Sequence, residues 1–216
     1  MISKLKLGRR DILLFLIGLV PLIIGFIYYS SLPEQVAIHF NLFNGEGNGF
    51  IMKELYLPLI CFFTIGFPLL FKITRQIDPK RFNYIKFEDT FEMIRLLITV
   101  LLSVLFILTI LYNIGFTITM ERWGIPVLGV FLIFIGNITG RIRYNFFIGF
   151  RTPWTLANED VWRRTHRFGG PIFIVSGILM LISLFFEKPL WIILFAFLVL
   201  IIIPTMYSYV ISRKLR

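Results

Sequence analysis

Residues 141–170 read RIRYNFFIGFRTPWTLANEDVWRRTHRFGG, and this polar stretch between two apolar runs decides how the chain is organised. Its six arginines, with no lysine among them, are Arg141, Arg143, Arg151, Arg163, Arg164 and Arg167. An arginine at the centre of a bilayer costs about 2.5–3.5 kcal/mol, so a group of six is expected in water or among lipid headgroups. The flanking apolar runs would then hold a cationic, aromatic surface at one face of a membrane.

Six apolar runs predict membrane-spanning helices. They cover residues 12–29, 55–73, 96–116, 125–140, 171–186 and 189–211. The chain is 57% hydrophobic with a mean hydropathy of +0.84, which favours an integral membrane protein over a soluble one. A span needs about 20 apolar residues, and the fourth and fifth runs are short. Those two are expected to span with help from Trp123 and from arginines at the inner end, and a single re-entrant hairpin is the alternative.

The cationic side chains are distributed unevenly over the segments between the runs. Of the 22 Lys and Arg residues, all but Lys53, Arg122 and Lys188 fall on alternating segments that share one side of the membrane. Because basic residues mark the cytoplasmic side, we expect a multi-pass protein of the cell membrane with both termini in the cytoplasm. The membrane topology then explains the formal net charge of +10. We expect anionic membrane lipids as partners and no direct contact with nucleic acid.

The predicted fold is an all-α integral membrane protein, a six-helix transmembrane bundle with a small outer β-hairpin and a cytoplasmic interfacial helix. Residues 1–73 supply two spans and the outer loop 30–54, residues 74–140 supply spans three and four with a cytoplasmic loop, and residues 141–216 supply the loop 141–170 and spans five and six.

Local signals support the two smaller elements. Residues 36–40 alternate as a strand would, the Asn-Gly pairs at 44–45 and 48–49 favour turns, and residues 49–52 fit a return strand. In the loop 141–170, Asn158 or Thr155 is a good helix N-cap, and Gly169-Gly170 is expected to end that helix.

Residues that carry catalysis or bind metals are sparse. The middle of each predicted span lacks carboxylate, His, Lys and Arg side chains, which argues against a proton-coupled transporter. Asn113 and Asn137 are expected to hold helices together. His39 and His166 fall on opposite faces of the membrane, and Cys61 is the only cysteine. We expect no catalytic, cofactor-binding or metal-binding residue, and therefore no enzyme.

RTPWTL at 151–156, followed by W-x-x-T-H-R at 162–167, resembles the signature of the SdpI/YfhL family of bacterial membrane proteins. Further matching residues are Asn145, Gly149, Glu159 and Gly169-Gly170. The outer loop resembles an uncharacterised domain that often precedes this signature, through Leu32-Pro33-Glu34, Ile38-His39-Phe40-Asn41 and Gly45. Ala37 and Gly47-Asn48 stand where that pattern usually has Pro and Pro-Asp.

The resemblance implies an immunity protein, which protects a toxin-producing cell from a secreted, membrane-active peptide. For the best-studied kind it also implies a receptor that holds a small winged-helix repressor at the membrane. The candidate partner-binding residues on the cytoplasmic side are Asn145, Arg151, Thr152, Pro153, Trp154, Glu159, Trp162, His166 and Arg167. The candidate toxin contacts in the outer loop are His39, Phe40, Asn41 and Phe50.

Within the cytoplasmic set, Arg151, Trp154, Trp162 and Arg167 are predicted to make the contact, because Arg and aromatic residues are the commonest interface hot spots. Three other interpretations stay open. The chain could be a transporter of the peptide, or a lipid- or wall-precursor enzyme whose arginines bind phosphate. The loop could also be a plain connector with tryptophans as headgroup anchors.

Overall fold

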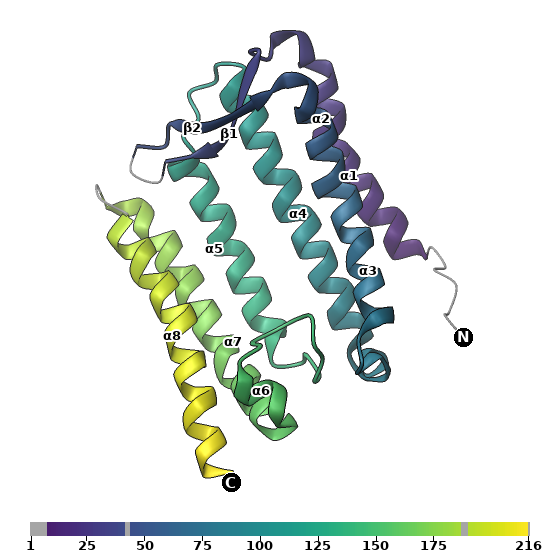
Figure 1. The fold of residues 1–216 in the computed structure, drawn as a ribbon. Helices are drawn as coiled ribbons and strands as arrows, with labels where there is room; N and C mark the ends of the chain where they lie inside the picture. The colour runs from purple at the N-terminus through teal and green to yellow at the C-terminus, as the bar shows by residue number, and fades with distance from the viewer. Residues whose placement is uncertain (1–7, 42–43, 187–189, 216) are drawn as a thin grey trace. The chain divides into compact units, whose positions relative to one another are not determined.

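The computed structural model describes residues 8–41, 44–186 and 190–215 (Figure 1). Lys188, one of the three outer cations in the charge pattern, and the first residue of the sixth apolar run lie outside these ranges. In chain order the elements are α1 (Arg9–Ile27), η1 (Tyr29–Ser31), β1 (Gln35–Phe40), β2 (Gly47–Met52), α2 (Lys53–Cys61), η2 (Phe62–Gly66), α3 (Phe67–Ile77), η3 (Arg81–Phe87), α4 (Glu88–Asn113), α5 (Met120–Thr139), α6 (Pro153–Ala157), α7 (Glu159–Ile182), η4 (Ser183–Phe185) and α8 (Leu190–Lys214).

Six helical segments in the described ranges are long and apolar enough to cross a membrane. They are Arg9–Ile27, Lys53–Ile77, Arg81–Asn113, Met120–Thr139, Glu159–Phe185 and Leu190–Lys214. The predicted all-α membrane fold with a β-hairpin is confirmed. The two apolar runs that looked short extend into polar sequence and become helical segments of 20 and 27 residues. At 1.5 Å per residue even the shorter one reaches about 30 Å, the thickness of the hydrocarbon layer.

The chain forms two compact units, and each takes residues from two separate stretches. The hairpin unit comprises residues 1–72 and 95–127, and the motif unit comprises residues 73–94 and 128–216. The helices α3, α4 and α5 each begin in one unit and end in the other. The division at residues 73 and 140 expected from the sequence is a different partition, and it stays a prediction.

In the hairpin unit, β1 pairs antiparallel with β2, as the alternation predicted. Asn44-Gly45 lies in the connection between the strands as predicted, but the turn predicted at Asn48-Gly49 is wrong, because both residues lie within β2, which begins at Gly47. Val36 lies opposite Ile51, and the register shifts on either side of His39. Val36 is buried in one cluster with Tyr56 and Ile110, so the hairpin packs on the ends of α2 and α4 (Figure 1).

Asn113 at the end of α4 ties the hairpin to the helices. Its Oδ1 accepts the Ala37 N–H at 2.8 Å, and its Nδ2 donates to the Ala37 carbonyl at 3.0 Å. The amide therefore binds the backbone of β1, where the sequence had suggested a contact between helices. Asn137 donates to the carbonyl of Ile133 in its own helix at 2.8 Å.

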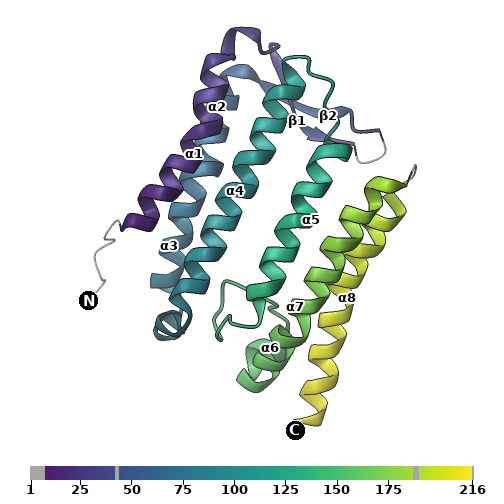
Figure 2. The same ribbon diagram turned by 180° about the vertical axis from the view of Figure 1, so that it is seen from behind.

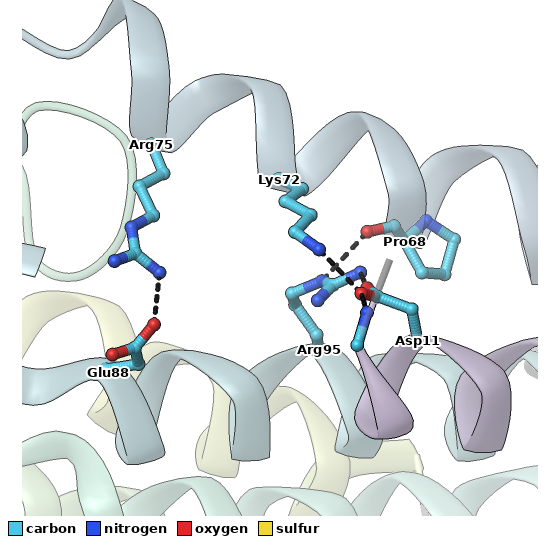
Figure 3. A network of polar contacts seen from close by, with 7 residues as sticks. Asp11, Pro68, Lys72, Arg75, Glu88 and Arg95 are labelled. Atoms are coloured by element: carbon cyan, nitrogen blue, oxygen red, sulfur yellow. Dashed lines mark hydrogen bonds and ion pairs between the residues drawn. The ribbon is translucent and has the colours of Figure 1, made fainter. Parts of the chain in front are cut away.

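A buried ion network joins α1, α3 and α4 within the hairpin unit (Figure 3). Asp11 receives Lys72 Nζ at 2.6 Å and Arg95 Nη2 at 2.9 Å, and Arg95 Nε donates to the Pro68 carbonyl at 3.0 Å. Only 4% of Asp11 and 1% of Arg95 are exposed. The middle of the predicted spans holds no charge, but charges near helix ends meet here in the interior.

In the motif unit, α7 and α8 lie side by side in both views (Figures 1 and 2). Asn158 caps α7 as predicted, since its Oδ1 accepts the N–H groups of Asp160 and Val161 at 2.8 and 3.2 Å. The prediction that Gly169-Gly170 ends this helix is wrong, because α7 runs unbroken to Ile182. The interfacial helix is the first part of a long helix.

Glycines of α7 lie directly against glycines of α5, which allows the two helices to pack closely. A methyl group on Gly170 would lie 2.7 Å from the Gly136 carbonyl oxygen, and one on Gly177 would lie 2.4 Å from that of Gly129. The backbones of α5 and α7 therefore touch at two levels, as small residues allow in membrane helices. In the sequence alone, Gly169-Gly170 predicts a helix end, because the sequence does not show that the backbone of α5 packs against Gly170.

Candidate functional site

Asn145 is fully buried and organises the loop that precedes the RTPWTL motif. Its Oδ1 accepts the N–H groups of Phe147 and Ile148, at 2.9 and 2.7 Å. Its Nδ2 donates to the carbonyl oxygens of Arg143 and Ile148, at 2.8 and 3.0 Å. Both an acceptor and a donor are needed, so a carboxylate could not replace this amide.

Asp78 holds the same loop from the other side, and the sequence pattern did not reveal it. It is buried, and its Oδ2 accepts the Tyr84 hydroxyl and the Phe146 N–H, both at 2.9 Å. The Asp78-Pro79 pair is a turn signal in the sequence. A turn signal does not point to a partner in a distant part of the chain, so the role of Asp78 emerges only from the structure.

Trp162 lies inside the fold with 1% of its surface exposed. Its indole N–H donates to the Ile142 carbonyl at 3.0 Å, its ring stacks on His166 at 4.1 Å, and Tyr144 packs edge-on against it. In this conformation Trp162 supports the motif loop and offers no surface to a partner. A direct contact of the predicted kind would require the loop to open.

Both ring nitrogens of His166 are engaged within the fold. Nδ1 lies 2.9 Å from the Trp162 carbonyl oxygen, and Nε2 accepts the Phe150 N–H at 3.0 Å. Because a carbonyl only accepts and a backbone N–H only donates, the ring is neutral with its proton on Nδ1. Gly149 permits this contact, since its φ is +117° and a methyl group there would lie 2.1 Å from Nε2. His166 therefore has no free nitrogen for acid–base chemistry.

The short helix α6 is tied to α8. Thr152 caps α6, its Oγ1 accepting the Thr155 N–H at 3.2 Å, and its hydroxyl lies 3.0 Å from that of Ser208. Trp154 packs edge-on against Tyr209 with ring centroids 5.1 Å apart. The half-buried Trp154 therefore has one side fixed on α8 and another side open.

The remaining members of the predicted cytoplasmic set are exposed. They are Arg151, Pro153, Glu159 and Arg167. Arg151 Nη1 donates to the Phe146 carbonyl at 2.8 Å, which anchors this arginine to the loop organised by Asn145. The set therefore divides into two parts. Asn145, Trp162 and His166 form a buried frame that holds the loop 141–170 in shape, and the exposed residues lie on the surface of that loop.

Among the outer-loop candidates, His39 and Phe50 are exposed on the hairpin. His39 Nδ1 lies 2.6 Å from Asn48 Oδ1, so a side-chain hydrogen bond links the two strands. Phe50 is 53% exposed and Met52, on the same face of β2, is 61% exposed. The hairpin thus presents apolar side chains beside a polar pair.

Phe40 and Asn41 are turned more toward the fold. Phe40 packs edge-on against Tyr112 at 4.9 Å, and the Tyr112 hydroxyl accepts the Gly47 N–H at 3.1 Å. The Asn41 N–H donates to the Glu46 carbonyl at 2.8 Å, which closes the hairpin. These two residues fix the position of the strands. The outer-loop set lies in the hairpin unit and the predicted cytoplasmic set in the motif unit.

No group of three His, Cys, Asp or Glu side chains within the described ranges could hold a metal ion. Cys61 is a free, exposed thiol.

Comparison with known proteins finds two family models and a relative that resemble this chain. Residues 141–208 match the SdpI/YfhL protein family, and residues 16–63 match a domain of unknown function, DUF1648. The chain is 27% identical over 210 residues to Immunity protein SdpI of Bacillus subtilis (strain 168), a match that covers 96% of this chain and 98% of that protein. No solved structure matches the chain. The signature loop, the preceding outer domain and the near full-length similarity agree, and the chain is similar to the SdpI/YfhL protein family along nearly its whole length.

Proposed function

We propose that this chain is a membrane immunity protein that protects its cell from a secreted, membrane-active peptide toxin, without catalysis. The similarity to a protein named as an immunity protein, over nearly the whole of both chains, is the observation that carries the proposal. The charge pattern supports an orientation with both termini in the cytoplasm and the hairpin outside. A toxin that arrives from outside would then reach the hairpin.

The exposed face of the hairpin is the part best suited to a hydrophobic peptide. Phe50 and Met52 are exposed side by side on β2, and Ile38 on β1 is also exposed. Asn113 and Tyr112 fix the backbone of this hairpin to α4, so the strands that carry these apolar side chains need no ordering when a ligand binds. An apolar surface that is held in place before binding and is surrounded by polar groups is typical of binding sites.

Survival and membrane potential test the proposal in a toxin-sensitive bacterium that expresses this chain and is challenged with the peptide. We expect growth and potential to be held at doses that collapse cells with empty vector. Collapse at the same dose, with the protein present in the membrane, would contradict immunity to that peptide.

A paired substitution then locates the contact. Phe50→Ser with Met52→Ser is expected to abolish protection at unchanged membrane abundance. Phe116→Ser is the matched control, since Phe116 is a similarly exposed phenylalanine in the link between α4 and α5, at 57%. An equal loss of protection in Phe116→Ser would show that the substitutions at Phe50 and Met52 act through folding.

The finer part of the proposal is signalling through the cytoplasmic motif. Arg151 and Arg167 are exposed and Trp154 is half-open, while Asn145 and Trp162 hold the loop beneath them. We propose that the exposed three contact a winged-helix repressor. Alanine at all three should abolish recruitment of a fluorescent repressor to the membrane and leave protection intact. If recruitment and protection both survive, the loop is a connector.

A further inference from the structure

A polar cavity of about 680 Å³ opens within the motif unit, apart from the buried frame of the signature loop. It is lined by three segments: residues 85–90 around the start of α4, residues 140–143 after the end of α5, and the first turns of α7. The N-terminal ends of α4 and α7 and the C-terminal end of α5 meet there, so the cavity lies at helix ends, the level at which headgroups sit.

Five cationic side chains line this cavity: Lys86, Arg141, Arg143, Arg163 and Arg167. Two acidic side chains, Glu88 and Asp89, line it as well. Glu88 is bound to Arg75 at 2.7 Å, Asp89 has an interaction of its own, and Arg163 pairs with Asp160 at 2.7 Å. Over the part of the chain that the structure describes, the other four cations have no carboxylate partner.

Four uncompensated cations around one cavity repel each other, and an anion inside it would offset that cost. Guanidinium groups match the geometry of phosphate oxygens and bind them by paired hydrogen bonds. The lining therefore suits a phosphate group.

The mouth of the cavity favours a phosphate that carries acyl chains. Ile85 lines the cavity and is exposed, and Phe82 on the same short helix η3 is exposed beside Arg81, whose guanidinium lies 5.2 Å from its ring centre. Exposed apolar side chains beside basic ones are what a membrane surface binds. We infer that this cavity holds the phosphate of an anionic phospholipid headgroup, with η3 against the acyl region.

Native mass spectrometry of the purified full chain, equilibrated with phosphatidylglycerol and phosphatidylcholine, tests the inference. The wild type is expected to retain phosphatidylglycerol in preference to phosphatidylcholine. Arg143→Gln with Arg167→Gln should reduce that preference about tenfold or more, since charge-assisted hydrogen bonds to phosphate are lost. Arg164→Gln with Arg213→Gln is the matched control: two arginines are again removed, neither lines the cavity, and Arg164 lies in the same helix.

Folding is checked by circular dichroism and thermal melting. If the first pair fails to fold, Lys86→Gln with Arg141→Gln removes two other cavity cations and must give the same loss. An equal loss in the control pair would overturn the site in favour of general surface charge. Retention of the preference in a folded cavity variant would overturn it directly.

Two competitors distinguish the source of the anion. Inorganic phosphate that displaces the lipid at millimolar concentration would assign the site to a soluble phosphate and overturn the lipid assignment. Displacement by a poly-glutamate peptide, with no lipid selectivity, would assign the cavity to an acidic protein segment. The inference stands whether or not the chain confers immunity, because lipid retention is measured without toxin.

Discussion

At the residue scale, Gly149 is the position where the signature loop is most tightly constrained. Alanine there would have to adopt a φ of +117° and would place its methyl group 2.1 Å from His166 Nε2. We expect Gly149→Ala to unfold the motif loop and to shift the fluorescence of Trp162, which stacks on His166. Gly115→Ala is the control, since Gly115 has a φ of +94° and open space around it, so it reports backbone strain alone, about 1–3 kcal/mol. Equal melting shifts in the two variants would show that the histidine contact does not matter.

Arg95 gives a second prediction at this scale. Arg95→Leu removes one of the two cations that pair with the buried Asp11 and leaves Lys72 in place. The loss should therefore approach, from below, the cost of about 3–5 kcal/mol for breaking a buried pair outright. Arg75→Leu breaks the partly exposed pair with Glu88, and such pairs contribute about 1 kcal/mol or less. Thermal melting in detergent should therefore show a large loss of stability for Arg95→Leu and a small one for Arg75→Leu. A reversed order would contradict the burial of the Asp11 network.

The signature motif does not predict which of its residues are buried and which are exposed. The sequence predicts Trp162 and His166 as contact residues, but the structure buries both, with hydrogen-bond partners in the preceding loop. Arg95 and Asp11 lie 84 residues apart, and no local pattern links them. Burial depends on distant partners, so it could not be read from the motif.

At the scale of elements, hydropathy and alternation were sufficient for the spans and the hairpin, since both signals are local. The course of α7 was not predictable, because Gly170 looks like a helix end until Gly136 is brought against it. We expect Gly170→Val to separate α5 from α7 and to reduce the folded yield in the membrane strongly. Gly66→Ala, where an added methyl meets only ordinary contacts at 3.5 Å, should keep the yield. Normal folding of Gly170→Val would show that the backbones need not touch.

At the scale of the whole molecule, the unequal distribution of basic residues predicts the orientation, and labelling of single cysteines tests it. Cys61 is the only cysteine and is exposed, so Cys61→Ala supplies a cysteine-free background. Asn48→Cys on the hairpin should react with a membrane-impermeant maleimide in intact cells, because we place the hairpin outside. Arg164→Cys on α7 should react only after the membrane is permeabilised. Asn48 and Arg164 are both exposed, so a difference in labelling reports sidedness and not burial. The opposite pattern would invert the topology, put the basic cavity outside the cell, and remove the cytoplasmic repressor from the proposed function.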